Sequence, residues 1–196
     1  MKAHNLPATA EEILWHESPN ICQPHCLKLP EFLASIELNS PSSPIWQADW
    51  PLLVFLEESC LKSMEKHAAN DILREQAGIL CGHAYVDGGQ LYVNITAALP
   101  VDTVSDSAHF AFHETSWQAI WNRLDDNSTI LGWYHTHPGM GVFLSATDLR
   151  TQKLHFSLPW QIAIVIDPVS GQSGVFAGSE GQRVGGDQVY LYYRKQ

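Results

Sequence analysis

The 196-residue chain is acidic, because 11 lysines and arginines stand against 21 aspartates and glutamates, which gives a formal charge of −10 at pH 7. This balance disfavours nucleic acid and anionic membranes as partners and suits a basic partner protein. A hydrophobic content of 45% is enough for one sizeable core. The longest apolar runs are too short to span a bilayer, and the first residues form no apolar signal core, so we expect a cytosolic protein.

The first fifty residues differ in composition from the rest of the chain. Prolines are scattered between positions 7 and 44, with only short apolar pieces among them. We therefore predict an N-terminal extension or accessory element over residues 1–50 and one domain over residues 51–196. Cys22, His25 and Cys26 could form half of a structural zinc site, although no second Cys/His pair lies at zinc-finger spacing.

Strand and helix patterns alternate through the predicted domain. Apolar segments bounded by turn residues predict strands at 52–55, 78–85, 91–99, 130–134, 162–166, 174–177 and 189–193. Helical periodicity predicts helices over 58–70, over a tryptophan-rich segment from Thr115 to Leu124, and around Asp148. The Asp-Gly-Gly sequence at 87–89 is typical of a hairpin turn. The order of elements favours an α/β (α+β) fold with a mixed sheet and helices packed on it, rather than a doubly wound parallel sheet.

Two histidines at the end of one predicted strand indicate a metal site. Alternate strand residues share a face, so His135 and His137 project together while Thr136 points to the other face. Ser145 stands where the next helix should begin, and Asp148 falls in the first turn of that helix. Ligands of the His, His and Asp types suit Zn²⁺, and a fourth position left to water is typical of a catalytic site.

A hydrolytic zinc site needs a carboxylate that accepts a proton without binding the metal, and Glu75 is the leading candidate. It precedes an apolar strand in which Gly78 and Gly82 permit close backbone approach. Two structural alternatives stay open. Glu75 also reads as a surface glutamate beside Arg74, and Ser145 also reads as an ordinary helix N-cap.

Other polar residues carry weaker signals. His113 and Glu114 begin like a His-Glu-x-x-His zinc-protease helix, but Trp117 stands where the second histidine should be. We expect His109 and His113 to flank a strand end instead. Cys60 and Cys81 lie within apolar patterns and are expected to act as small hydrophobic residues.

These motifs resemble those of the JAMM (MPN-plus) metalloproteases. The family pattern is an upstream Glu, then His-Ser/Thr-His, seven residues and Ser-x-x-Asp, and the chain matches it at Glu75, His135 to His137, Ser145 and Asp148. The segments 75–82 and 164–168 also resemble those of the family, so the resemblance extends over about residues 52–178. It implies a mostly antiparallel, curved sheet between helices in the JAMM/MPN, cytidine-deaminase-like architecture.

The resemblance also implies a chemistry for each matching position. Zn²⁺ would be held by His135, His137 and Asp148, while Glu75 activates a water molecule and Ser145 stabilises the oxyanion. The implied activity is that of an isopeptidase that cleaves after the C-terminal glycine of a ubiquitin-like protein, either from a lysine or from a precursor. The partners would be the tail of that modifier and its conjugates.

Three readings of the biology remain open at this stage. The compact chain is similar to bacterial JAMM proteins that accompany ubiquitin-like modifiers, some of them in antiviral defence. A second reading is a peptidase that releases cysteine from a sulfur-carrier protein, and a third is a non-catalytic binding scaffold. The segments after Leu99 and between Asp148 and Gln161 leave little room for long insertions, so linkage selectivity is not expected.

Overall fold

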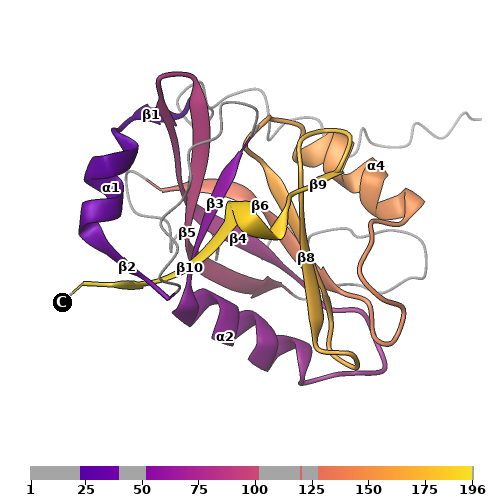
Figure 1. Ribbon diagram of the computed structural model, residues 1–196. Coiled ribbons are helices and arrows are strands. Elements are labelled where there is room, and N and C mark those ends of the chain that lie inside the picture. Colours follow the sequence, from indigo (N-terminus) through magenta and orange to yellow (C-terminus); the bar gives the residue numbers. More distant parts are fainter. Residues whose placement is uncertain (1–22, 40–51, 102–119, 121–127, 196) are drawn as a thin grey trace, which may run out of the picture.

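A single mixed sheet organises the part of the chain that the computed structural model describes, which is residues 23–39, 52–101, 120 and 128–195 (Figure 1). Its strands are β1 (His25–Cys26), β2 (Ile36–Leu38), β3 (Leu53–Glu57), β4 (Ala77–Asp87), β5 (Gln90–Val101), β6 (Thr129–Thr136), β7 (Ile162–Asp167), β8 (Gln172–Ala177), β9 (Gln182–Arg183) and β10 (Val189–Arg194). The α-helices with described bounds are α1 (Leu29–Ser35), α2 (Glu58–Ala68) and α4 (Ala146–His155).

The sheet combines long antiparallel ladders with parallel pairs. The strand order is β2-β10-β3-β5-β4-β6-β7-β8-β9, and β1 pairs with β4 outside this path. The ladders β4–β5, β4–β6 and β7–β8 are antiparallel, whereas β6–β7, β3–β5 and β3–β10 are parallel. This arrangement confirms the predicted mixed sheet and excludes a doubly wound parallel one.

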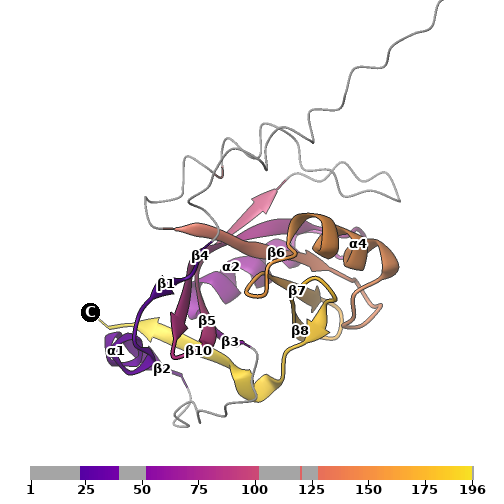
Figure 2. The same ribbon diagram turned by 90° about the horizontal axis from the view of Figure 1, so that it is seen from above.

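Helices cover both faces of the sheet, as Figure 2 shows from above. On one face, α2 buries Cys60, Met64 and Ala68 against alternate residues of the central strands. On the other face, Trp133 of β6 packs with Phe156 at the end of α4. Because successive strand residues point to opposite faces, the same strands supply side chains to the hydrophobic clusters on both faces.

Where the structure describes them, the predicted elements agree with those observed, apart from their end residues. The turn at Gly88 and Gly89 has positive φ at both glycines (56° and 92°), which is the backbone that a two-residue hairpin needs. Cys60 and Cys81 are buried free thiols, and burial raises their pKa values to about 11 and about 12. Both therefore behave as the small hydrophobic residues that the sequence predicted.

The predicted tryptophan-rich helix lies outside the described residues except for Ile120. Ile120 is buried in the same hydrophobic cluster as Trp133. His109, His113 and Cys22 also lie outside the described ranges. Among the described residues, no helix is long and apolar enough to cross a membrane.

The described N-terminal residues, 23–39, pack on the sheet. Strand β2 pairs with β10, and α1 buries Phe32 in an aromatic cluster with Phe55 and Tyr92. Asp87, at the β4–β5 hairpin, accepts a hydrogen bond from the Leu29 amide at 3.0 Å, at the start of α1. The predicted domain boundary at residue 50 stays a prediction. Strand β2 lies before that boundary in the chain, yet it forms part of the same sheet as the strands that follow the boundary.

Candidate metal centre

Strand β6 delivers two buried imidazoles to one place at the end of the sheet. His135 and His137 are 0% and 2% exposed, and their Nε2 atoms lie 3.2 Å apart. The indole ring of Trp133 stacks on the His135 ring, with centroids 4.3 Å apart and an interplanar angle of 13°. The convergence predicted from alternate strand positions is therefore present, and the His135 ring is held by packing.

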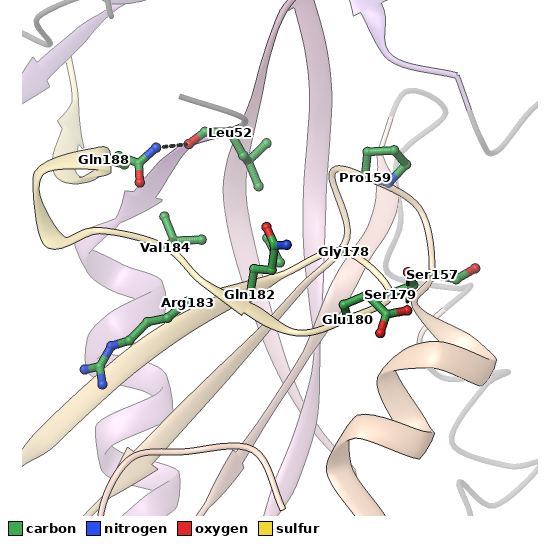
Figure 3. Close-up of a pocket in the computed structure, with 11 residues that line it drawn as sticks. Leu52, Ser157, Pro159, Gly178, Ser179, Glu180, Gln182, Arg183, Val184 and Gln188 are labelled. Atoms are coloured by element: carbon green, nitrogen blue, oxygen red, sulfur yellow. Dashed lines mark hydrogen bonds between the residues drawn. The ribbon is translucent and has the colours of Figure 1, made fainter. Parts of the chain in front are cut away.

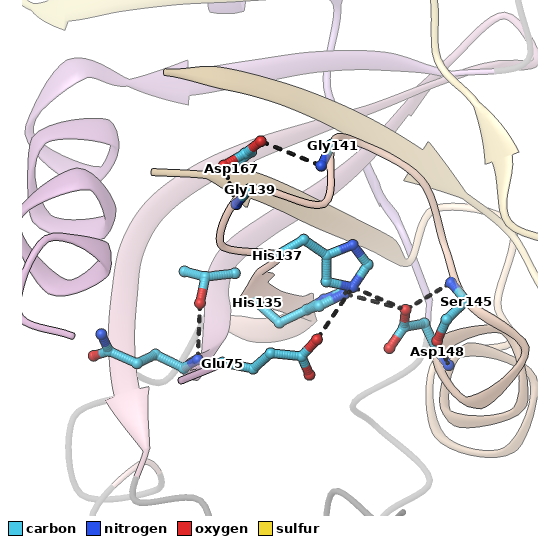
Figure 4. Close-up of polar contacts among 10 residues, drawn as sticks. Glu75, His135, His137, Gly139, Gly141, Ser145, Asp148 and Asp167 are labelled. Atoms are coloured by element: carbon cyan, nitrogen blue, oxygen red, sulfur yellow. Dashed lines mark hydrogen bonds and ion pairs between the residues drawn. The ribbon is translucent and has the colours of Figure 1, made fainter. Parts of the chain in front are cut away.

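The N-terminus of α4 brings a carboxylate to the two histidines. Ser145 is the N-cap, its hydroxyl accepts a hydrogen bond from the Asp148 amide at 3.2 Å, and the Asp148 carboxylate accepts one from the Ser145 amide at 2.7 Å. This reciprocal capping box fixes the direction of the Asp148 side chain. Asp148 is 2% exposed, and Figure 4 shows its carboxylate directed at the histidines.

The three candidate ligand atoms form a nearly equilateral triangle. The Asp148 Oδ2 atom lies 3.4 Å from His135 Nε2 and 3.3 Å from His137 Nε2, which complements the 3.2 Å between the imidazoles. Tetrahedral Zn²⁺ with ligand bonds of about 2.0–2.1 Å places its donors about 3.3–3.4 Å apart. These residues therefore fit the zinc ion that the resemblance implies.

Charge within this group also favours a cation. Burial alone would raise the pKa of Asp148, but its contacts with His135 and His137 hold the pKa far below the usual range. Burial alone would lower the pKa of His137, but its contact with Asp148, together with the Glu75 carboxylate and the Gly141 backbone, outweighs burial and raises the pKa. A carboxylate thus stays ionised in a buried place and needs positive charge beside it.

Glu75 lies beside this triangle and is separate from it. Its Oε1 atom is 3.8 Å from His137 Nε2, and its side chain is 39% exposed, in contact with solvent. In Figure 4, Glu75 and Asp148 approach the histidines from opposite sides. The group of mutually close ligand atoms consists of His135, His137 and Asp148 among the described residues, so the position of Glu75 agrees with that of a carboxylate that does not bind the metal.

The loop between His137 and Ser145 is held by a buried carboxylate. Asp167, at the end of β7, accepts hydrogen bonds from the amides of Gly139 at 2.8 Å and Gly141 at 3.2 Å (Figure 4). It also accepts bonds from the amides of Val169 and Ser170 and from the Ser170 hydroxyl. These bonds, led by that from Gly139, lower the pKa of Asp167 to about 2. The loop that joins two ligands is therefore fixed to the neighbouring strand.

Gln152 ties the helix that carries Asp148 to the strand that carries the histidines. Its Oε1 atom accepts the Trp133 indole N–H at 2.9 Å, and its Nε2 atom donates to the Phe156 carbonyl at 2.9 Å. Longer bonds of 3.3 Å reach the carbonyls of Gln161 and Gly178. Gln152 is fully buried, so these bonds replace those that water would make.

Sequence reasoning named five site residues, and the structure brings all five to one end of the sheet. It did not name Gln152 or Asp167 as supports of the site. Asp167 carries a signal, since it ends the apolar strand within the segment 164–168 that resembles the family. Gln152 carries none beyond its place one helical turn after Asp148. The metal-binding and catalytic roles stay predictions, whereas the N-cap reading of Ser145 is confirmed.

A cavity is lined by residues other than those of the metal centre. It has a volume of about 310 Å³ and includes Ser157 and Pro159, beyond the C-terminus of α4, and Arg183 of β9 (Figure 3). The Gln188 amide at its edge donates to the Leu52 carbonyl at 3.3 Å. None of the five candidate site residues lines this cavity.

Comparison with known proteins identifies the family to which this chain belongs. The family described as JAB1/Mov34/MPN/PAD-1 ubiquitin protease matches residues 51–158, which include all five candidate site residues. The chain therefore belongs to this family, and the resemblance to JAMM/MPN proteins is confirmed.

Individual relatives agree with the family. Ubiquitin carboxyl-terminal hydrolase RPN11 of Saccharomyces cerevisiae is 28% identical over 149 residues, which are 74% of this chain and 48% of that protein. COP9 signalosome complex subunit 5 of Caenorhabditis elegans is 32% identical over 119 residues, which are 58% of this chain and 32% of that protein. The chain thus spans about half of the first of these relatives and a third of the second.

A solved structure supports the fold. The solution structure of protein DSY2949 from Desulfitobacterium hafniense matches with a TM-score of 0.55 and 22% identity, and the match covers 74% of this chain and 96% of that one. At this level of identity the likeness concerns the fold alone.

Proposed function

We propose that this protein is a zinc-dependent isopeptidase that cleaves after the C-terminal glycine of a ubiquitin-like protein. The observation that carries the proposal is the buried triangle of His135, His137 and Asp148, with the Glu75 carboxylate 3.8 Å from His137 and open to solvent. The family and the names of the relatives support the choice of a ubiquitin-like substrate. The bacterial conjugation or defence pathway that the resemblance implies belongs to the same proposal.

The chemistry divides between the metal and one side chain. Bound Zn²⁺ supplies a Lewis acid, which polarises a carbonyl and lowers the pKa of water from about 15.7 to about 7. His135, His137 and Asp148 would hold the ion. Glu75 would accept the proton of the attacking water on its carboxylate and deliver that proton to the leaving amine, a contribution of about 10²- to 10⁴-fold.

The Ser145 hydroxyl and the overall charge of the chain also fit this scheme. The Ser145 hydroxyl oxygen accepts a hydrogen bond from the Asp148 amide, and we assign the hydroxyl hydrogen as a donor to the developing oxyanion. The formal charge of −10 suits a substrate protein with a basic surface around its tail.

The test is a comparison of wild type with Glu75→Gln. Purified protein should contain zinc and should cleave at least one member of a panel of ubiquitin-like proteins extended at their C-terminal glycine. Glu75→Gln should retain zinc and lose at least about 100-fold in kcat. Glu65→Gln is the matched control, because Glu65 is exposed on α2 and should leave kcat unchanged.

The outcomes separate the other readings. A Glu75→Gln variant with full activity contradicts the assigned mechanism. Mass spectrometry of the products distinguishes an isopeptidase, which releases a lysine amine or a peptide, from a sulfur-carrier peptidase, which releases cysteine. Wild-type protein without zinc at neutral pH and without turnover on the whole panel would favour the binding scaffold.

A further inference from the structure

The ladder between β4 and β6 ends in an unusual rung directly beside Glu75. Ala77 pairs with His135, so Gln76 and Thr136 form the next rung. The Thr136 amide donates to the Gln76 carbonyl at 2.9 Å, as an antiparallel ladder requires. The reciprocal bond from the Gln76 amide, also 2.9 Å, is accepted by the Thr136 side-chain hydroxyl.

We propose that Thr136 is a positioning residue whose hydroxyl holds the Gln76 backbone, and thereby aims the Glu75 carboxylate at the metal centre. The inference rests on the proposed role of Glu75 as the base. Thr136 lies between the two histidines but points to the other face of the strand. It can therefore act on the base without touching the metal.

Burial makes the hydroxyl contact specific. Thr136 is 0% exposed and Gln76 is partly buried, so removing the hydroxyl would take from the Gln76 amide the acceptor that the protein provides. The residue before Gln76 is Glu75, and a shift of the Gln76 backbone moves the Glu75 side chain with it. The 3.8 Å separation between Glu75 and His137 therefore depends on the hydrogen bond between the Gln76 amide and the Thr136 hydroxyl.

Among the described residues, the other hydrogen bonds of the loop between α2 and β4 stay within the loop or reach back to α2. Asp71 accepts hydrogen bonds from the amides of Leu73 at 2.9 Å and Arg74 at 3.1 Å, and its carbonyl accepts the Gln76 side-chain amide at 3.0 Å. These bonds give the loop a shape but do not attach it to β6. The two bonds between Gln76 and Thr136 supply that attachment.

Three variants test the inference in the zinc-loaded, full-length protein. Thr136→Val keeps the shape of the side chain and removes the acceptor, whereas Thr136→Ser keeps the hydroxyl. Thr96→Val, on β5, is the matched control, because Thr96 is partly buried and lies on a strand that does not carry the site. The probe is ubiquitin with a fluorogenic amide at its C-terminus.

We expect Thr136→Val to lose at least about tenfold in kcat, with KM within twofold and zinc affinity within threefold of wild type. Thr136→Ser should recover kcat to within threefold. In the Glu75→Gln background, Thr136→Val should cause no further loss, because the two residues would act through one step. A merely structural role would instead lower activity in both backgrounds.

Hydrogen exchange supplies a readout that does not need turnover. In wild type and in Thr136→Ser the Gln76 amide should exchange slowly, and in Thr136→Val at least tenfold faster, with or without zinc. Unchanged exchange at Gln76, a kcat of Thr136→Val within twofold of wild type, or equal losses in both backgrounds would each overturn the inference. Absence of zinc and turnover in wild type would instead contradict the proposed function, while the exchange result still decides the hydrogen bond.

Discussion

Replacing Gln152 by methionine tests whether the buried amide joins α4 to β6. Methionine has nearly the length and volume of glutamine, so the substitution removes polar atoms without opening a large cavity. It takes the acceptor from the Trp133 indole N–H and the donor from the Phe156 carbonyl. The carbonyls of Gln161 and Gly178 keep backbone partners, the amides of Gly178 at 3.0 Å and Gly181 at 3.1 Å.

The expected loss of stability follows from two buried groups deprived of a partner. Each such group costs about 1–3 kcal/mol, so Gln152→Met should lower the free energy of unfolding by about 2–6 kcal/mol. This is a large share of the roughly 5–15 kcal/mol that stabilises a typical protein. Because α4 carries Asp148, zinc affinity should fall as well.

The assay is urea unfolding of the metal-free protein, followed by tryptophan fluorescence, with chelator competition for zinc affinity. Gln172→Met is the matched control, since Gln172 is exposed on β8 and should change stability by less than about 0.5 kcal/mol. If Gln152→Met is as stable as this control, the conclusion that the hydrogen bonds of Gln152 hold α4 against β6 is wrong.

Two further substitutions test the backbone around the site. Gly132→Ala should prevent folding, because a Cβ atom at this position would lie 1.8 Å from the Ile162 carbonyl oxygen and the backbone φ is +144°. Circular dichroism should show unfolded protein. The control Gly186→Ala should fold normally, because the space around Gly186 is open. Asp167→Asn should weaken zinc binding about 10- to 100-fold, because an amide nitrogen would face backbone N–H groups that now donate to the carboxylate. Chelator competition measures this affinity. The control Asp87→Asn alters a carboxylate at the β4–β5 hairpin and should leave zinc affinity unchanged. The pKa of Asp167 is lowered to about 2 from its usual value of about 3.9, so its carboxylate stabilises the fold above about pH 4, and this contribution is lost as pH falls toward 2. The free energy of unfolding, measured across that range, should therefore depend less on pH in Asp167→Asn than in wild type.

Much of the fold could be predicted because local patterns and packing agree. The apolar runs, the positive-φ glycines at 88 and 89 and the capping box at Ser145 each mark a local structure that the protein adopts. The convergence of His135 and His137 follows from the two-residue period of a strand, which needs no knowledge of neighbouring elements.

The supports of the site could not be predicted, because they depend on register between distant segments. The bond between Gln76 and Thr136 joins residues 60 positions apart, and the position of Glu75 depends on it. Gln152 has the appearance of an ordinary polar residue on a helix until Trp133 is placed against it. The packing of α1 on the sheet likewise depends on partners such as Phe55 that follow it in the chain.

Zinc content tests the central claim most directly. Elemental analysis of protein purified at neutral pH should find one zinc ion per chain in wild type, and little in Asp148→Ala or His137→Ala, while Glu75→Gln keeps its zinc. Wild-type protein without zinc, or ligand variants that hold as much zinc as wild type, would contradict the account.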